Sequence, residues 1–306
     1  MRPRHFTRYW PPVAIVSLGL GLTYGILLGG MAGRQRQLIY RPRAEHSLLP
    51  SDVAFHLDYQ SMWIPIAGSS DRLHAWWLPR TEQSYVVLPN EPHDTVPPNK
   101  VVLYLCGVGR NMGDYNYLAR ASAFRQLGFS VLMFDYRGYG RSDGDFPHES
   151  QLYADAAAAW NYLINEQGIA AADIVIYGES LGGAIALDLA LQHPDAAALI
   201  LQSSFTSMAD AIQQKLFTRL FPVEQILTER FDSLGRIGRL QVPVLFLHGE
   251  ADSVVPAAMS QHLYAAAPEP KQIFLIPGAD HVSIYQPKDD SYLKAIASFV
   301  GSLPER

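Results

Sequence analysis

The sequence predicts an α/β fold, in which helices cover both faces of a mainly parallel, eight-stranded sheet. Short apolar runs of the kind that form buried strands alternate along the chain with longer stretches of helical periodicity. This alternation is typical of strand–helix–strand units, whose strands run parallel. With 306 residues and a hydrophobic content of 48%, the chain favours one large core with attachments over two independent cores.

The predicted elements begin with an antiparallel hairpin. Alternating apolar and polar residues at 62–66 and 73–78 flank a turn-forming stretch, Gly-Ser-Ser-Asp, at 68–71. Several prolines then make 85–99 a predicted loop. After this loop we expect, in order, strand 101–105, helix 115–127, strand 130–134, helix 151–167, strand 173–177, helix 181–192, strand 197–202, strand 242–247 and strand 272–276.

Residues 206–240 interrupt this series between two predicted strands. Apolar residues recur there at helical spacing, namely Ile212, Leu216, Leu220, Ile226 and Leu227. We therefore expect a small helical cap over the edge of the sheet. Two uses of its apolar side chains remain open, since they can line a pocket for an acyl chain or pack onto the main domain.

A reactive serine is predicted at Ser180. It lies in the sequence Gly-Glu-Ser-Leu-Gly at 178–182, directly after one predicted strand and before a predicted helix. The pattern G-x-S-x-G at a strand-to-helix turn forms a nucleophile elbow, which lifts the serine hydroxyl above the sheet. A serine hydroxyl is a weak nucleophile by itself, so it needs a base and a group that orients the base.

Asp252 and His281 are the predicted partners of Ser180. Each follows a predicted strand, 242–247 and 272–276 respectively, within a few residues of the strand's end. The carboxyl ends of parallel strands meet at the edge where α/β sheets bind ligands. The order Ser, Asp, His along the chain is that of α/β-hydrolases. We therefore predict that His281 is the general base and that Asp252 orients it.

From about residue 61 to residue 303 the chain resembles the α/β-hydrolase superfamily. Besides the elbow, three stretches carry the resemblance: 135–142 resembles the loop after strand four, 201–208 the segment that leads into a small cap, and 248–256 the loop of the catalytic acid. The chain is also similar to the membrane-anchored, small-cap group of α/β-hydrolase-domain proteins, whose members include protein depalmitoylases. The resemblance implies a serine hydrolase without a cofactor, which cleaves carboxylic ester or thioester bonds of small-molecule or lipid-like substrates through an acyl-enzyme.

Such an enzyme needs two backbone N–H donors for the oxyanion of its tetrahedral intermediate. The first predicted donor is Leu181, which follows the nucleophile at a helix N-terminus. Alignment with the His-Gly-x pattern of the family implies Val108 as the second. Cys106 stands where the family has a histidine. In the family that histidine organises the loop, so a cysteine at this position affects the geometry of the loop and not the triad. We interpret Cys106 as a buried, space-filling thiol.

Other charged residues near the predicted site receive structural interpretations. Asp280 is expected to be a solvated or loop-bonding carboxylate, and Glu179 a structural hydrogen-bonding group. Asp252 has an alternative role as the cap of a helix that begins near Pro256. The sequence contains no H-E-x-x-H, C-x-x-C or P-loop pattern, so no metal site and no nucleotide site are predicted.

The charge of the chain is unevenly distributed. Residues 1–43 hold seven of the 24 basic residues and no acidic residue, which leaves 17 basic against 29 acidic residues in the remainder. Because the positive charge belongs to one short tail, and no interleaving of aromatic and basic residues follows it, a surface for nucleic acid is not expected. We assign residues 1–12 as a basic N-terminal tail.

A membrane anchor is predicted after this tail. Residues 13–31 contain no charge, and a helix of this length is about 28 Å long, close to the thickness of a bilayer core. We predict an anchor at 13–33, a juxtamembrane linker at 34–60 and a hydrolase domain at 61–306. A cleaved signal peptide is the alternative, although Gly-Met-Ala-Gly at 30–33 is a weak cleavage site. Arginines flank both ends almost equally, so the side on which the domain lies stays open.

Small residues recur every fourth position along the predicted anchor, at Ser17, Gly21, Gly25, Gly29 and Gly33. Such a stripe allows two membrane helices to approach closely, which predicts a homodimer through Gly21, Gly25 and Gly29. Since glycine is common in membrane helices, chance is the alternative explanation.

Several functions remain open for this sequence. The same triad serves ester and thioester hydrolysis, peptide or amide hydrolysis, and acyl transfer to an acceptor other than water. Dehalogenase and epoxide hydrolase activities are disfavoured because they need an aspartate where Ser180 stands. The non-enzymatic alternative is a membrane scaffold that has the fold but no catalytic activity.

Overall fold

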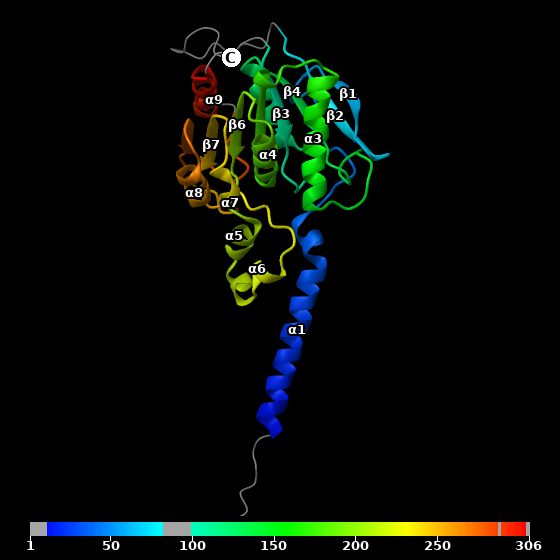
Figure 1. The fold of residues 1–306 in the computed structure, drawn as a ribbon, viewed down its shortest axis with the longest axis vertical. Helices are drawn as coiled ribbons and strands as arrows, with labels where there is room; N and C mark the ends of the chain where they lie inside the picture. Colours follow the sequence, from blue (N-terminus) through cyan, green and yellow to red (C-terminus); the bar gives the residue numbers. More distant parts are fainter. Residues whose placement is uncertain (1–10, 82–98, 287–288, 304–306) are drawn as a thin grey trace, which may run out of the picture.

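A single eight-stranded sheet forms the centre of the protein in a computed structural model that describes residues 11–81, 99–286 and 289–303, with only the backbone of 11–15. The strand order is β1-β2-β4-β3-β5-β6-β7-β8 (Figure 1). The strands are β1 (Gln60–Pro65), β2 (Arg72–Leu78), β3 (Val101–Leu105), β4 (Ser130–Phe134), β5 (Ile174–Glu179), β6 (Ala198–Gln202), β7 (Val244–Gly249) and β8 (Lys271–Ile276). The pair β1–β2 and the pair β2–β4 are antiparallel, whereas all remaining pairs are parallel.

The predicted mainly parallel sheet is confirmed, and its strands show the burial that this architecture requires. Strands β3, β5, β6 and β7 are buried along their whole length, whereas β1 at the edge of the sheet alternates between exposed and buried residues. Parallel strands need cover on both faces, so near-continuous apolar runs are their sequence pattern. Most of the predicted loop 85–99 and most of the predicted tail 1–12 lie outside the described residues.

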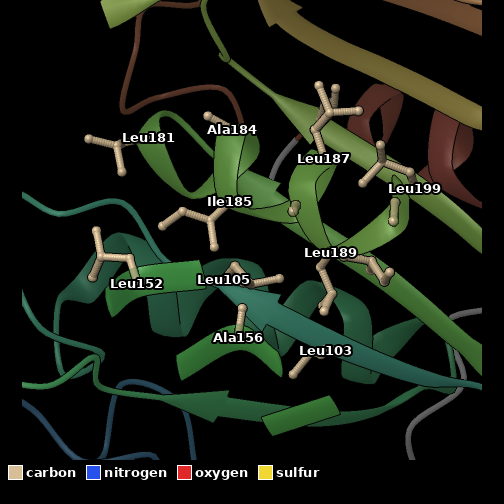
Figure 2. Close-up of a cluster of buried hydrophobic side chains, with 14 of the residues drawn as sticks. Leu103, Leu105, Leu152, Ala156, Leu181, Ala184, Ile185, Leu187, Leu189 and Leu199 are labelled. Atoms are coloured by element: carbon tan, nitrogen blue, oxygen red, sulfur yellow. The ribbon is translucent and has the colours of Figure 1, made fainter. Parts of the chain in front are cut away.

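Helices cover both faces of this sheet. On one face lie α3 (Glu149–Asn165), α4 (Leu181–Gln192) and α8 (Ala257–Ala266), and on the other lie α2 (Tyr115–Gln126) and α9 (Ser291–Gly301). Figure 2 shows the first layer, in which Ile185 of α4 points toward Leu105 of β3. Side chains of β3 alternate between the two layers, since Leu103 and Leu105 belong to one buried cluster and Val102 to the other.

A group of short helices lies between β6 and β7, where the cap was predicted. It consists of α5 (Met208–Gln213), the 3₁₀ helix η2 (Leu216–Leu220), α6 (Val223–Ile226) and α7 (Leu234–Ile237). The 3₁₀ helix η1 (Ala171–Asp173) belongs to the connection before β5. In Figure 1 the helices α5 and α6 lie below the sheet, beside the upper part of α1.

The N-terminal helix α1 (Pro11–Ile39) has 29 residues and projects away from the domain as a single rod (Figure 1). By length and composition its residues 16–39 are sufficient to cross a membrane. The helix continues through 34–39, the first part of the predicted linker, because side chains there bind the domain. The Gln35 side chain accepts a hydrogen bond from the Thr228 backbone at 2.7 Å, and Arg36 donates to the Pro147 carbonyl at 2.8 Å.

The rest of the predicted linker, residues 40–59, is held against the domain by backbone contacts. The Arg41 N–H donates to the Val108 carbonyl at 3.3 Å. The Asn111 side-chain amide donates to the carbonyls of Arg43 and Glu45 at 3.0 and 2.6 Å. These contacts set the direction of α1 relative to the loop that contains Val108.

Candidate active site

Ser180 alone forms the turn between β5 and α4. Its backbone has φ 53° and ψ −122°, a region that residues other than glycine rarely occupy. The Ser180 N–H donates to the Gln202 carbonyl at 2.8 Å, which ties the turn to β6. A methyl group on Gly182 would overlap the carbonyl oxygens of Leu105 and Cys106. The glycine therefore allows α4 to begin directly against β3, and the strained turn lifts the serine side chain from the sheet.

His281 contacts both of the other residues predicted to act with it. Its Nε2 lies 3.2 Å from Oγ of Ser180, and its Nδ1 lies 2.7 Å from Oδ2 of Asp252. The three side chains come from the ends of β5, β7 and β8, at the same edge of the sheet. With one nitrogen at a carboxylate and the other at a hydroxyl, the imidazole is arranged to accept the hydroxyl proton.

Asp252 is buried and is bound at both of its carboxylate oxygens. Oδ1 accepts hydrogen bonds from the backbones of Val254 and Val255 at 2.9 and 2.8 Å, whereas Oδ2 faces His281. Burial raises the pKa of Asp252, but hydrogen bonds with His248 and His281 outweigh this effect and hold the pKa well below its usual range. The carboxylate is thus ionised at neutral pH. Its contacts bind the turn at 254–255, one turn before α8 begins.

His248 is a second histidine beside Asp252, and the sequence did not single it out. Its Nε2 lies 3.2 Å from Oδ2 of Asp252 and 2.8 Å from the Val255 carbonyl, while its Nδ1 lies 2.6 Å from Oγ of Ser260. His248 is fully buried, so it faces no substrate. Its contacts fix the position of the carboxylate to which His281 is bound.

The residues predicted as oxyanion donors lie next to Ser180. Leu181 is the first residue of α4, and Val108 belongs to the loop after β3. A methyl group on the neighbouring Gly107 would lie 3.6 Å from Cβ of Ser180, so this loop passes close to the serine. The Val108 carbonyl accepts a hydrogen bond from the Tyr139 hydroxyl at 2.8 Å. The role of the two N–H groups stays a prediction.

A cavity of about 700 Å³ opens at Ser180 and His281. Its size is within the range of small-molecule sites. Most of its wall is apolar and comes from three parts of the chain: helix α1, the loop after β3 and the cap. The apolar residues that α1 and the cap contribute include Met31, Leu38, Ile39, Met208, Ile212, Phe217, Ile226 and Leu227. Among the cap residues singled out in the sequence, Ile212, Ile226 and Leu227 line the cavity, whereas Leu216 and Leu220 are exposed.

Comparison with known proteins identifies the family. The profile of the family described as "Serine aminopeptidase, S33" matches residues 96–235 and 223–288, which is more than half of the chain. The chain belongs to this family of α/β-hydrolases. A relative from Mycobacterium tuberculosis is 36% identical over 280 residues, with 90% of this chain and 88% of the relative covered. The protein bem46 of Schizosaccharomyces pombe is 30% identical over 286 residues, with the same coverage of both chains.

Solved structures share the fold of this hydrolase at low sequence identity. An esterase from Pyrococcus furiosus superposes with a TM-score of 0.66 at 18% identity, covering 86% of this chain and 96% of the esterase. A puromycin-hydrolysing peptidase from Mycobacterium tuberculosis superposes with a TM-score of 0.62 at 23% identity, covering 82% of this chain and 40% of the peptidase. These similarities confirm the fold of the predicted hydrolase.

A buried ion pair in the hydrolase connects the two loops that carry Ser180 and His281. Arg120 of α2 binds Glu179 at two points, Nε to Oε2 at 2.6 Å and Nη2 to Oε1 at 2.8 Å. Its Nη1 also donates to the Val282 carbonyl at 3.3 Å. Glu179 directly precedes Ser180, and Val282 directly follows His281. The structural role expected for Glu179 agrees with these contacts, whereas Arg120 was missed because an arginine in an amphipathic helix normally faces solvent.

Replacing Arg120 by methionine is expected to lower the free energy of unfolding by about 3–5 kcal/mol, because the Glu179 carboxylate would stay buried without its counter-charge. The measurement is chemical denaturation of the detergent-solubilised chain. Arg72→Met is the matched control, since Arg72 pairs with Asp143 at 3.1 Å and both side chains are exposed to solvent, and such pairs contribute at most about 1 kcal/mol. Equal losses in the two variants would contradict the structural role of Arg120.

Cys106 and Asp280 have the surroundings expected of non-catalytic groups. Cys106 is buried, and burial together with the nearby charge of Glu179 raises the pKa of its thiol well above the ordinary value. A thiol in this state is inert. Asp280 is exposed, and its Oδ1 accepts hydrogen bonds from the backbones of Val282 and Ser283 at 2.9 and 2.8 Å. Its carboxylate shapes the loop that carries His281.

A cluster of His46, His74 and Asp135 lies apart from these residues, with its potential ligand atoms within 4.8 Å of one another. The Nε2 of His46 lies 2.6 Å from Oδ2 of Asp135, and the Nε2 of His74 lies 2.8 Å from Oγ of Ser61. Two ligand atoms of one tetrahedral zinc ion are about 3.3 Å apart. The distance between Nε2 of His46 and Oδ2 of Asp135 is shorter than this. In this arrangement the His46 and Asp135 side chains bind each other by a hydrogen bond.

Proposed function

We propose that the protein is a membrane-anchored serine hydrolase that cleaves carboxylic ester or thioester bonds. Ser180 is the nucleophile, His281 the general base and Asp252 the group that orients and stabilises the imidazolium. The observation that carries the proposal is the pair of distances at His281, 3.2 Å to the serine hydroxyl and 2.7 Å to the carboxylate. Membership of an α/β-hydrolase family supports the same reaction class.

In the proposed reaction His281 accepts the proton of Ser180 while Oγ attacks the carbonyl carbon. The oxyanion that forms accepts hydrogen bonds from the backbones of Leu181 and Val108, each worth about 3–4 kcal/mol of the barrier. When the intermediate collapses, His281 gives its proton to the leaving alcohol or thiol, and the acyl group stays on Ser180. A water molecule, deprotonated by His281, then attacks the acyl-enzyme. When this second intermediate collapses, His281 returns the proton to Ser180 Oγ and the acid is released.

The charges in the cavity favour an ester or thioester over a peptide with a free N-terminus. An aminopeptidase has to bind the ammonium group of its substrate, which requires an available carboxylate near the reactive serine. The two carboxylates in the described wall are Asp114 and Glu179, and each is paired with an arginine at 2.6 Å. The apolar remainder of the wall suits an acyl chain. Amide hydrolysis and transfer of the acyl group to another acceptor are the alternatives.

Fluorophosphonate labelling and a substrate series test this proposal on the full chain in detergent. We expect the wild-type protein to be labelled and to hydrolyse p-nitrophenyl esters and acyl thioesters faster than aminoacyl amides, with kcat/KM rising with acyl length. Absence of labelling would favour the idle scaffold. A preference for aminoacyl amides would favour the peptidase, and a preference for the shortest esters would remove the lipid-like substrate.

The proposed anchor is α1, and its contacts with the domain argue for retention rather than cleavage. Removing the segment before Gly33 would delete Tyr24, whose hydroxyl donates to the Leu220 carbonyl at 3.0 Å, and Met31, which lines the cavity. An N-terminal epitope tag tests retention. We expect the tag to remain on the mature protein and to resist alkaline extraction from membranes, whereas a cleaved leader would be lost.

We further propose that the glycine stripe of α1 associates two copies of the chain. A methyl group added to Gly21, Gly25 or Gly29 would meet nothing within 4 Å, so the cap does not cover this stripe. Substituting Gly25 by leucine is expected to reduce crosslinking between copies in the membrane. Unchanged crosslinking would contradict the dimer.

A further inference from the structure

Large apolar side chains are exposed at the tip of the cap. In η2, Leu216 is 79% exposed, Phe217 60% and Leu220 74%. These three side chains lie within five consecutive residues, on a segment that contributes little to the core. Clustered apolar residues of this size on a surface mark a site of interaction with another apolar surface.

The tip of the cap is in direct contact with α1. The ring of Tyr24 stacks on Phe221 at a centroid distance of 5.4 Å and an angle of 5°, and the Tyr24 hydroxyl donates to the Leu220 carbonyl at 3.0 Å. Tyr24 lies ten positions before Arg34, the first charged residue after the predicted anchor, or about 15 Å along the helix axis. The tip of the cap therefore lies beside the uncharged part of the helix, inside the predicted anchor.

We propose that Leu216, Phe217 and Leu220 insert into the same lipid bilayer that α1 crosses. The inference rests on the proposed membrane anchor, and it adds a second point of contact with the membrane. Amphipathic elements that lie in the membrane interface insert their apolar side chains by about 5–10 Å. Tyr24 lies within the predicted anchor, so the tip beside it is at a level inside the bilayer.

Two polar side chains at the tip are bound to backbone carbonyls, which lowers the cost of placing them in lipid. The Thr218 hydroxyl lies 2.7 and 2.6 Å from the carbonyl oxygens of Ile212 and Lys215, which share its one hydrogen. Arg219 donates from Nε to the Gln213 carbonyl at 3.2 Å. Lys215 and Arg219 are exposed beside the apolar residues, and their long side chains can extend to the phosphates of the headgroups.

Insertion of the tip places the cavity at the membrane surface. Phe217 belongs both to the exposed tip and to the cavity wall, and Met31, Ala32 and Leu38 of α1 line the same cavity. The cavity thus lies between two elements that contact lipid. An acyl chain leaving the bilayer between the cap and α1 reaches Ser180 without crossing water, which defines the substrate of the proposed hydrolase as a membrane-embedded acyl ester or thioester.

Fluorescence of an environment-sensitive probe tests the insertion on the full chain in phosphatidylcholine vesicles that contain anionic lipid. A thiol-reactive nitrobenzoxadiazole probe is attached to Leu216→Cys, and the unsubstituted protein verifies that the buried Cys106 is not labelled. The matched control is Glu166→Cys, an exposed position at the end of α3, which is about 25 Å long and begins beside α1. We expect lipids with a spin label in the upper acyl chain to quench the probe at 216 and iodide to leave it unaffected, with the reverse result at 166.

Two outcomes of this experiment would overturn the proposal. Quenching of the probe at 216 by iodide as strong as at 166 would show a tip in water. Protection from both quenchers would show that a protein surface, such as a second copy of the chain, covers the tip.

A double variant, Leu216→Ser with Leu220→Ser, tests the consequence for the substrate. Neither side chain lines the cavity, so fluorophosphonate labelling and hydrolysis of a short, water-soluble ester are expected to be unchanged. We expect kcat/KM for a long-chain ester presented in vesicles to fall about tenfold or more, since apolar contact with the bilayer is lost. Equal rates for the long-chain ester would overturn the proposal. If the wild-type protein fails to react with fluorophosphonate, the proposed hydrolase is wrong, while the probe experiment still reports on insertion.

Discussion

Replacing Ser180 by alanine is expected to abolish fluorophosphonate labelling and to reduce kcat by a factor on the order of 10⁶. The substitution removes only the hydroxyl group, and without this group no acyl-enzyme forms. Residual hydrolysis would come from binding and from the N–H groups of Leu181 and Val108, with water as a direct nucleophile. The measurement is the initial rate of ester hydrolysis by the full-length chain in detergent. The melting temperature is recorded for the wild-type protein and for the variant.

Ser253→Ala is the matched control for this experiment. Ser253 is exposed and follows Asp252 directly, so it lies close to the proposed site. We expect this variant to keep its labelling and its kcat within about twofold, as is usual for surface substitutions. Wild-type rates in Ser180→Ala would show that another group is the nucleophile, because the distance of 3.2 Å to His281 would then have no catalytic meaning.

Asp252→Asn is expected to reduce kcat by about 10⁴-fold and to lower the melting temperature, since the ionised carboxylate stabilises the folded state at neutral pH. An asparagine keeps an oxygen that can accept the hydrogen bonds from Val254 and Val255, so the turn is retained. The side chain loses the charge that stabilises the imidazolium of His281. Its amide nitrogen also faces a ring nitrogen that must carry a proton in the productive tautomer. The measurement is kcat for a short ester, together with the melting temperature.

Asp280→Asn serves as the matched control, because Asp280 is adjacent to His281 in sequence and carries the same carboxylate. It is exposed, and its contacts are with the backbones of Val282 and Ser283. We expect kcat to change less than about threefold. Similar losses of kcat in the two variants would indicate a general effect of negative charge near the histidine rather than a specific role for Asp252.

The sequence alone determined where the strands lie along the chain. It also predicted that Ser180, Asp252 and His281, at the ends of β5, β7 and β8, form one site. Buried parallel strands need continuous apolar runs, so elements such as 101–105 and 130–134 coincide with β3 and β4. Residues that follow strands at a shared edge are candidates for a site, and Ser180 is predicted from its flanking glycines and from the strand before it. Each of these patterns is local, because it involves only residues that lie within a few positions of one another in the sequence.

Contacts between distant parts of the chain were decided by the tertiary structure. Arg120 and Glu179 are 59 positions apart, and only the packing of α2 against β5 brings the guanidinium to the carboxylate. Helix α1 forms part of the cavity wall because Gln35 and Arg36 bind the domain, which periodicity within the helix does not encode. Pairing of this kind depends on the distance and direction between two elements, and these are set when the whole core packs.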